Sequence, residues 1–195
     1  ISLVKIRPLT HHIVEKIQKG EYKMAQILVV NFGGQYTDLI GRRVRECGVR
    51  SETLAPERLA TQLGSHKPKG IILSGSWASV YEKNAPRIPD EIFNLGVPIM
   101  GICFGMHAIA HRLGGTVVQG QKEYGPRRFL RIGEVPDPLF RNIPPVSIVL
   151  ASHGDSVAIL PPGGIPLGST IQGCQIAAFR LEEQKIWGIQ FHPES

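Results

Sequence analysis

The chain has 195 residues, 42% of them hydrophobic, with 22 Lys and Arg against 16 Asp and Glu and a formal net charge of +6. This length suits one globular domain, and no apolar run reaches the roughly 18 residues that a membrane span needs. The basic residues are spread out and lack interleaved aromatic residues, so we expect neither nucleic acid nor a membrane as partner. The cysteines (Cys47, Cys103 and Cys174) form no CxxC pair, which argues against a zinc site or a disulfide framework and favours a reduced, cytoplasmic setting.

Residues 1–23 are predicted to be an N-terminal extension of unknown role, and residues 24–195 the domain itself. Met24 directly precedes the first convincing strand. Within the extension, residues 10–19 have the spacing of a short amphipathic helix.

Apolar runs and helical patterns alternate over the first half of the domain. The predicted strands are 27–30, 49–54, 70–73 and 97–101, and the predicted helices are 36–47, 56–63, 86–95 and 106–113. Repeated strand–helix pairs predict an α/β fold with a mostly parallel central sheet flanked by helices on both faces. Ligands of such sheets bind at the carboxyl ends of the strands.

The pattern changes after residue 115. Short strand-like runs separated by Pro and Gly turns follow, at 116–119, 128–132, 146–151, 176–180 and 186–190. We expect this half to add antiparallel strands and to supply the closing strand of the main sheet.

Cys103 stands between two glycines, Gly101 and Gly105, where a predicted strand meets a predicted helix. Glycines at such a turn permit a strained backbone that exposes the intervening side chain. The free N–H groups at the start of the helix favour a thiolate there. A small buried cysteine in a glycine-rich turn is the alternative, but the strand–turn–helix context favours a nucleophile.

A base and an orienting group follow the last predicted strand. His192 comes at its carboxyl end, and Glu194 lies two residues further on, within reach of the imidazole. A Cys…His-x-Glu set with each part behind a strand predicts nucleophilic acyl-transfer chemistry. His107 and His111 share the i, i+4 spacing of zinc sites, but no further ligand has suitable spacing, so no metal site is expected.

The chain resembles the class I, triad-type glutamine amidotransferases, and within them the glutaminase domains of GMP synthetases. The similarity covers nearly everything from Met24 onward. It is carried by the segments 31–36 (NFGGQY), 41–46 (GRRVRE), 71–75 (IILSG), 101–106 (GICFGM), 123–125 (EYG), 152–155 (SHGD) and 188–194 (GIQFHPE).

The resemblance implies a flavodoxin-like fold and hydrolysis of glutamine to glutamate and ammonia. Cys103 would be the nucleophile, His192 the base and Glu194 its orienting group. Backbone groups of Gly75, Ser76 and Phe104 would form the oxyanion hole, and His107, Ser152, His153 and Gly154 would bind the substrate. No cofactor is expected in this domain: ATP and Mg would serve an ATP-dependent GMP synthetase domain or subunit that takes up the ammonia, and no P-loop motif occurs here.

Four positions depart from the family pattern, one of them Ala151, which stands before Ser152 where the family usually has Met. His107 replaces a glutamine, and Ser76-Trp77 replaces Gly-Pro in the oxyanion loop. If residue 76 needs a positive φ, Ser costs on the order of 1 kcal/mol more than Gly. We therefore expect weak glutaminase activity, or activity that depends on a partner. Family domains continue beyond the segment that ends here at Ser195, so a truncated domain is also expected.

Other interpretations remain open at this point. The chain could be the glutaminase subunit of anthranilate, carbamoyl phosphate or CTP synthesis, although the segment at 31–36 argues against those. It could be a catalytically weakened regulatory or binding module of the same fold, or a cysteine hydrolase that acts on other substrates.

Overall fold

In the computed structural model, residues 26–63, 68–133 and 137–195 are described, and their nine strands form one sheet with the order β2-β1-β3-β4-β9-β8-β7-β5-β6. The predicted extension, its helix at 10–19 and the predicted start of the domain lie outside these residues. Five neighbouring strands are parallel: β2 (Arg50–Leu54), β1 (Gln26–Val30), β3 (Gly70–Leu73), β4 (Ile99–Ile102) and β9 (Ile186–Ile189). The other four are antiparallel: β8 (Ala178–Leu181), β7 (Ile165–Thr170), β5 (Thr116–Arg131) and β6 (Val146–Ile159).

Helices cover both faces of the parallel part. Side chains alternate along β1, with Leu28 and Val30 in one apolar cluster and Val29 in the other. The first cluster includes residues of α3 (Pro56–Leu63) and α4 (Phe104–Arg112), and the second includes Ile40 and Val44 of α2 (Thr37–Glu46). The predicted α/β architecture is confirmed, because strands with two apolar faces need cover on each side.

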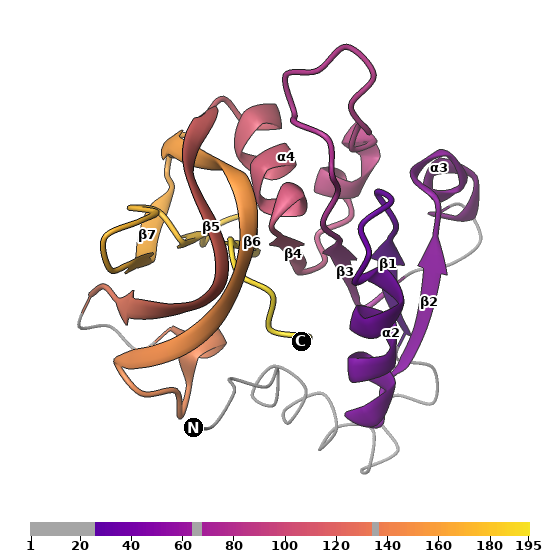
Figure 1. Ribbon diagram of the computed structural model, residues 1–195. Helices are drawn as coiled ribbons and strands as arrows, with labels where there is room; N and C mark the ends of the chain where they lie inside the picture. The colour runs from indigo at the N-terminus through magenta and orange to yellow at the C-terminus, as the bar shows by residue number, and fades with distance from the viewer. Residues whose placement is uncertain (1–25, 64–67, 134–136) are drawn as a thin grey trace.

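The second half forms a long hairpin. Figure 1 shows β5 and β6 curving over one side of the molecule, with α2, α3 and β2 on the other. The predicted short strands at 116–119 and 128–132 are parts of the single strand β5, whose register against β6 shifts between Gln119 and Glu123. A bulge of this kind bends a strand, so one long strand has the sequence pattern of two short ones.

Two further predictions need correction. The helix predicted at 86–95 is only a 3-10 helix, η1 (Asp90–Asn94), because Pro86 and Pro89 disfavour helical backbone before them. Strand β7 was not predicted, since it follows a run of Pro and Gly that is typical of turns. A second 3-10 helix, η2, spans Pro138–Phe140. Among the described helices, none is long and apolar enough to cross a membrane.

Candidate active site

Cys103 occupies a strained turn between β4 and α4. Its backbone has φ 52° and ψ −110°, a conformation that non-glycine residues rarely adopt, and its N–H donates to the Ile189 carbonyl at 2.8 Å. A Cβ on Gly101 would overlap the backbone of Gly105, so the turn needs glycine at its start. The predicted strand–turn–helix elbow around Cys103 is therefore confirmed.

His192 and Glu194 follow β9, the parallel neighbour of β4. The Nδ1 atom of His192 lies 2.7 Å from Oε1 of Glu194, and the His192 ring and Cys103 both lie beside Gly75 at the same cavity. The His192 N–H donates to the Leu150 carbonyl of β6 at 2.9 Å. Because a carboxylate accepts from Nδ1–H, the ring is held with Nε2 available to the thiol.

The surroundings of His192 favour its charged form. Burial by itself lowers the pKa of the imidazole, but the hydrogen bonds to Cys103 and Glu194, together with their charges, outweigh burial and raise the pKa to about 10. An imidazolium next to a thiol stabilises the thiolate. The three side chains can therefore form a thiolate–imidazolium pair, which is the reactive state of a cysteine nucleophile.

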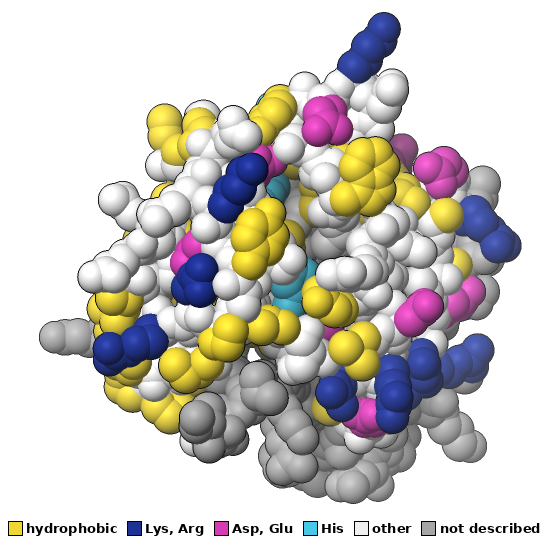
Figure 2. Space-filling view, in the orientation of Figure 1, with side chains coloured by type: hydrophobic (Ala, Val, Ile, Leu, Met, Phe, Trp, Pro, Cys, Tyr) yellow, Lys and Arg dark blue, Asp and Glu magenta, His cyan; other side chains and the backbone are white. Residues whose placement is uncertain are grey.

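These side chains open into a cavity of about 510 Å³. Its walls come from both halves of the chain: the loops after β1 and β3, the elbow, and the β5–β6 hairpin. The lining residues are Gly33, Gly34, Gln35, Tyr36, Gly75, Ser76, Trp77, Cys103, Tyr124, Ser152, His153, Gly154 and His192. Figure 2 shows a histidine side chain in a hollow at the centre of one face, among hydrophobic side chains.

The predicted oxyanion groups lie beside the thiol. A Cβ on Gly75 would lie 3.4 Å from the His192 ring and 3.8 Å from Cβ of Cys103. Phe104 begins α4, so its N–H belongs to the first turn, whose N–H groups have no partner within the helix. Ser76 does not have a positive φ, so the strain considered for serine at this position does not arise. Trp77 lies at the cavity wall with 85% of its surface exposed.

The predicted substrate-binding residues divide into two groups. Ser152, His153 and Gly154 line the cavity, and the Cys103 thiol contacts the Ser152 carbonyl at 3.7 Å. His107 does not line it: the side chain is buried in α4, with Nε2 2.7 Å from Oε1 of Gln190. Burial lowers the pKa of His107 to about 4 despite this hydrogen bond, so the ring is neutral.

Sequence reasoning assigned no role to two residues that support the site. The Arg43 guanidinium of α2 donates to the Glu194 carbonyl at 2.9 Å. The Tyr36 ring lies against the His192 ring, with 4.9 Å between their centroids. Arg43 is 151 residues away from its partner, and no spacing rule detects such a contact.

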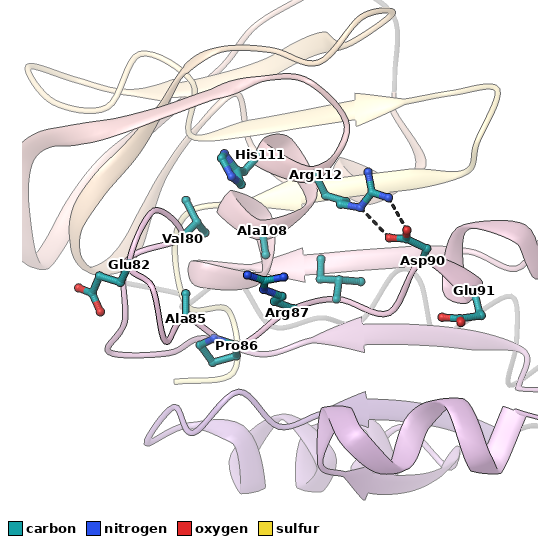
Figure 3. Close-up of a pocket in the computed structure, with 11 residues that line it drawn as sticks. Val80, Glu82, Ala85, Pro86, Arg87, Asp90, Glu91, Ala108, His111 and Arg112 are labelled. Carbon is teal, nitrogen blue, oxygen red and sulfur yellow. Dashed lines mark hydrogen bonds and ion pairs between the residues drawn. The ribbon is translucent and has the colours of Figure 1, made fainter.

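A second hollow of about 580 Å³ lies beside α4 and η1. Figure 3 shows Arg112 of α4 turned toward Asp90 of η1, and its Nε donates to Oδ1 of Asp90 at 2.6 Å. No cysteine lines this hollow. Across the described ranges, no three His, Cys, Asp or Glu side chains are placed to hold a metal ion.

Comparisons with known proteins point to one family. The profile of the class I glutamine amidotransferase family matches residues 28–195. A glutamine-hydrolysing GMP synthase from Thermosynechococcus vestitus is 47% identical over 169 residues, which are 86% of this chain and 31% of that protein. This chain thus spans about a third of the length of such curated relatives.

Solved structures share the fold. A candidate GMP synthase subunit from Thermoplasma acidophilum superposes with a TM-score of 0.71 at 28% identity, covering 88% of this chain and 85% of that one. For a glutamine amidotransferase from Thermotoga maritima the TM-score is 0.69 at 22% identity, with 87% and 76% covered. The match of the family profile and the identity to these curated relatives show that the chain belongs to the class I glutamine amidotransferase family, and its elbow and cavity are consistent with this.

Proposed function

We propose that this chain hydrolyses glutamine to glutamate and ammonia, and that an ATP-dependent GMP synthetase domain or subunit uses the ammonia to aminate XMP. The observation that supports the hydrolysis best is the meeting of Cys103 and His192, which Glu194 orients, at the wall of a 510 Å³ cavity. The link to GMP synthesis is supported by curated relatives that are named glutamine-hydrolysing GMP synthases.

In the proposed reaction, the Cys103 thiolate attacks the carboxamide carbon of glutamine. The C–N bond then breaks, the His192 imidazolium gives its proton to the departing ammonia, and a glutamyl thioester remains. Neutral His192 next takes a proton from water, and the resulting hydroxide releases glutamate and regenerates the thiol. Glu194 keeps the ring oriented through both steps, because its carboxylate accepts from Nδ1 at 2.7 Å.

Backbone groups stabilise the negative oxygen and hold the substrate. The N–H of Phe104 and a backbone N–H of the Gly75–Ser76 loop donate to the oxyanion, a contribution of roughly 3 kcal/mol for each such donor. The segment Ser152, His153 and Gly154 binds the α-amino and α-carboxylate groups of glutamine, since it lines the cavity. His107 lies outside the cavity lining, bonded to the buried Gln190, and is assigned no contact with the substrate.

The proposal assigns no cofactor to the glutaminase step. ATP and Mg belong to the synthetase partner, and the protein works in the cytoplasm. A weakened regulatory module of the same fold is the second candidate. The side chain of His107 turns away from the cavity, and a glutamine in its place is part of the family pattern.

Ammonia release from glutamine tests the proposal, with a cysteine outside the site as control. Cys103→Ala should lower kcat by at least about 10³-fold, because the nucleophile is lost. Cys47→Ala should stay within about twofold, since Cys47 lies at the end of α2, away from the cavity. Equal ammonia release by the wild type and Cys103→Ala would contradict the assignment of the nucleophile.

The partner is tested by adding an XMP-aminating synthetase and following GMP formation with glutamine as the nitrogen source. We expect GMP formation with the wild-type chain and none with Cys103→Ala. If ammonium chloride supports GMP formation and glutamine does not, the chain is the weakened module. His107→Gln in the same assay shows whether this position limits turnover.

A further inference from the structure

A buried carboxylate lies beneath the cavity wall, and the proposed reaction does not use it. Glu123 of β5 is 2% exposed. Its two oxygens accept hydrogen bonds from the Thr170 hydroxyl at 2.9 and 3.0 Å, and Oε2 also accepts from the Cys174 N–H at 3.1 Å. A carboxylate is costly to bury unless it is well partnered, so its burial here needs a physical explanation.

Directly across the strand pair from Glu123 stands His153 of β6. The imidazole Nε2 lies 3.2 Å from Oε2 of Glu123, and its Nδ1 lies 3.0 Å from the Asp155 carbonyl. The His153 side chain is 1% exposed and lies at the cavity wall between Ser152 and Gly154. Glu123 therefore contacts His153 of β6, and the preceding residue of that strand, Ser152, contacts the Cys103 thiol through its carbonyl.

The two contacts of the ring favour one proton on the Glu123–His153 pair, although Nε2 and Oε2 lie at ion-pair distance without the alignment of a hydrogen bond. A carbonyl oxygen can only accept, so Nδ1 carries a hydrogen and donates it to Asp155. If His153 is neutral, the lone pair of Nε2 then faces a carboxylate oxygen at 3.2 Å, and the two repel. One proton on the pair turns this repulsion into an attraction between Nε2 and Oε2.

We propose that Glu123 is a positioning residue for glutamine hydrolysis: it shares one proton with His153 and so holds residues 152–154 in place at the cavity wall. The inference rests on the proposed glutaminase function for its kinetic effect, and on the contacts alone for the shared proton. It goes beyond the triad, because Glu123 touches neither the nucleophile nor the substrate.

Other charged groups surround the pair. Arg127 of β5 lies 3.4 Å from Oε1 of Glu123, and the Asp155 carboxylate of β6 accepts a hydrogen bond from the Tyr81 hydroxyl at 2.8 Å. Of the neighbouring imidazoles, His192 acts on His153 as a positive charge, and His107 is neutral. Burial is the largest influence on His153 and holds the pKa of the ring below its usual value, and the charge of Glu123 is the largest influence that raises it. Without Glu123, the largest influence that favours a proton on the ring is lost, together with the ion-pair partner of Nε2.

The test is Glu123→Gln in the 195-residue chain, compared with Arg127→Gln as the matched control. Glu123→Gln keeps the size of the side chain but removes its charge and its affinity for the proton. We expect KM for glutamine to rise about tenfold while kcat stays within about threefold, since the triad is untouched. Arg127→Gln also alters the surroundings of Glu123 without contacting His153, and should change KM by less than about twofold.

Nitrogen NMR of His153 detects the proton directly. In the wild type near neutral pH, the Nε2 signal should lie away from the position of a free imidazole lone pair, and in Glu123→Gln it should move toward that position. A free lone pair on Nε2 of the wild type overturns the shared proton, even if the variant does not fold. An unchanged KM in a folded Glu123→Gln protein overturns the positioning role. If the wild type releases no ammonia from glutamine, the proposed function fails, and the NMR result still decides the shared proton.

Discussion

At the scale of single residues, His107 lies outside the lining of the cavity that holds Cys103. The His107 side chain is 3% exposed and donates from Nε2 to the Gln190 carboxamide. Burial from solvent at this site disfavours an imidazolium, because desolvation costs the charged form more than the neutral one. His107 therefore belongs to the packing behind the site and not to the cavity wall.

This burial predicts a pH dependence of stability. The pKa of His107 is about 4 in the folded protein and about 6.5 in an unfolded chain. Between these values the unfolded state binds more protons, so the free energy of unfolding increases as pH rises from about 4 to about 6.5. We expect His107→Gln to flatten this rise by an amount on the order of 3 kcal/mol. Urea denaturation at several pH values measures it, and identical slopes in both proteins would contradict the neutral state of His107.

At the scale of elements, α2 holds the segment that carries His192 and Glu194, through a hydrogen bond from Arg43. Its apolar residues Ile40 and Val44 face the sheet, as the sequence pattern predicts. Arg43, at the edge of this face, reaches the Glu194 carbonyl. The position of Glu194 therefore depends on a helix from the first third of the chain, and so does the orientation of His192.

Replacing Arg43 by Ala should lower kcat about tenfold, because the segment that carries Glu194 loses a charge-assisted hydrogen bond. Arg42→Ala is the control, since both arginines bind Glu46 but only Arg43 is bonded to Glu194. Arg42→Ala should leave kcat within about twofold, because exposed ion pairs contribute little. Steady-state ammonia release distinguishes the two variants, and equal losses would refute the anchoring role.

At the scale of the whole molecule, the parallel and antiparallel parts of the sheet meet at β9, and the cavity lies where both supply a wall. An aromatic cluster joins them: the ring of Phe129 in β5 lies 5.3 Å from Phe140 and 5.1 Å from Phe191, between centroids. Phe191 precedes His192 in the chain. The packing of the β5–β6 hairpin is thereby connected to the position of His192, the proposed base.

Removing this ring should therefore affect both stability and catalysis. Phe129 is 1% exposed, so Phe129→Ala should lower the free energy of unfolding by about 3–5 kcal/mol. Leu130→Ala, at the next position of the same strand, should cost less than about 1 kcal/mol because its side chain is 39% exposed. Denaturant titration measures both, and similar losses in the two variants would show that the cluster is not needed.

The sequence by itself determined the α/β class, the parallel strands and the elbow around Cys103. Each of these follows from local rules: apolar runs of strand length, helical spacing, and glycines that alone permit a strained turn. The pattern also placed His192 and Glu194 behind a strand, since their spacing lies within one short segment. Local rules did not predict strand β7, nor that residues 116–119 and 128–132 belong to the single strand β5, because both features depend on pairing with distant strands.

Only the tertiary structure decided which side chains meet. It turned His107 toward Gln190, brought Arg43 to Glu194 and set Glu123 opposite His153. These contacts depend on how sheet and helices pack, and that packing is decided by burial over the whole chain, not by neighbours in the sequence. The elbow around Cys103 could therefore be predicted from the residues around it, whereas the groups that hold the neighbouring side chains in place could not.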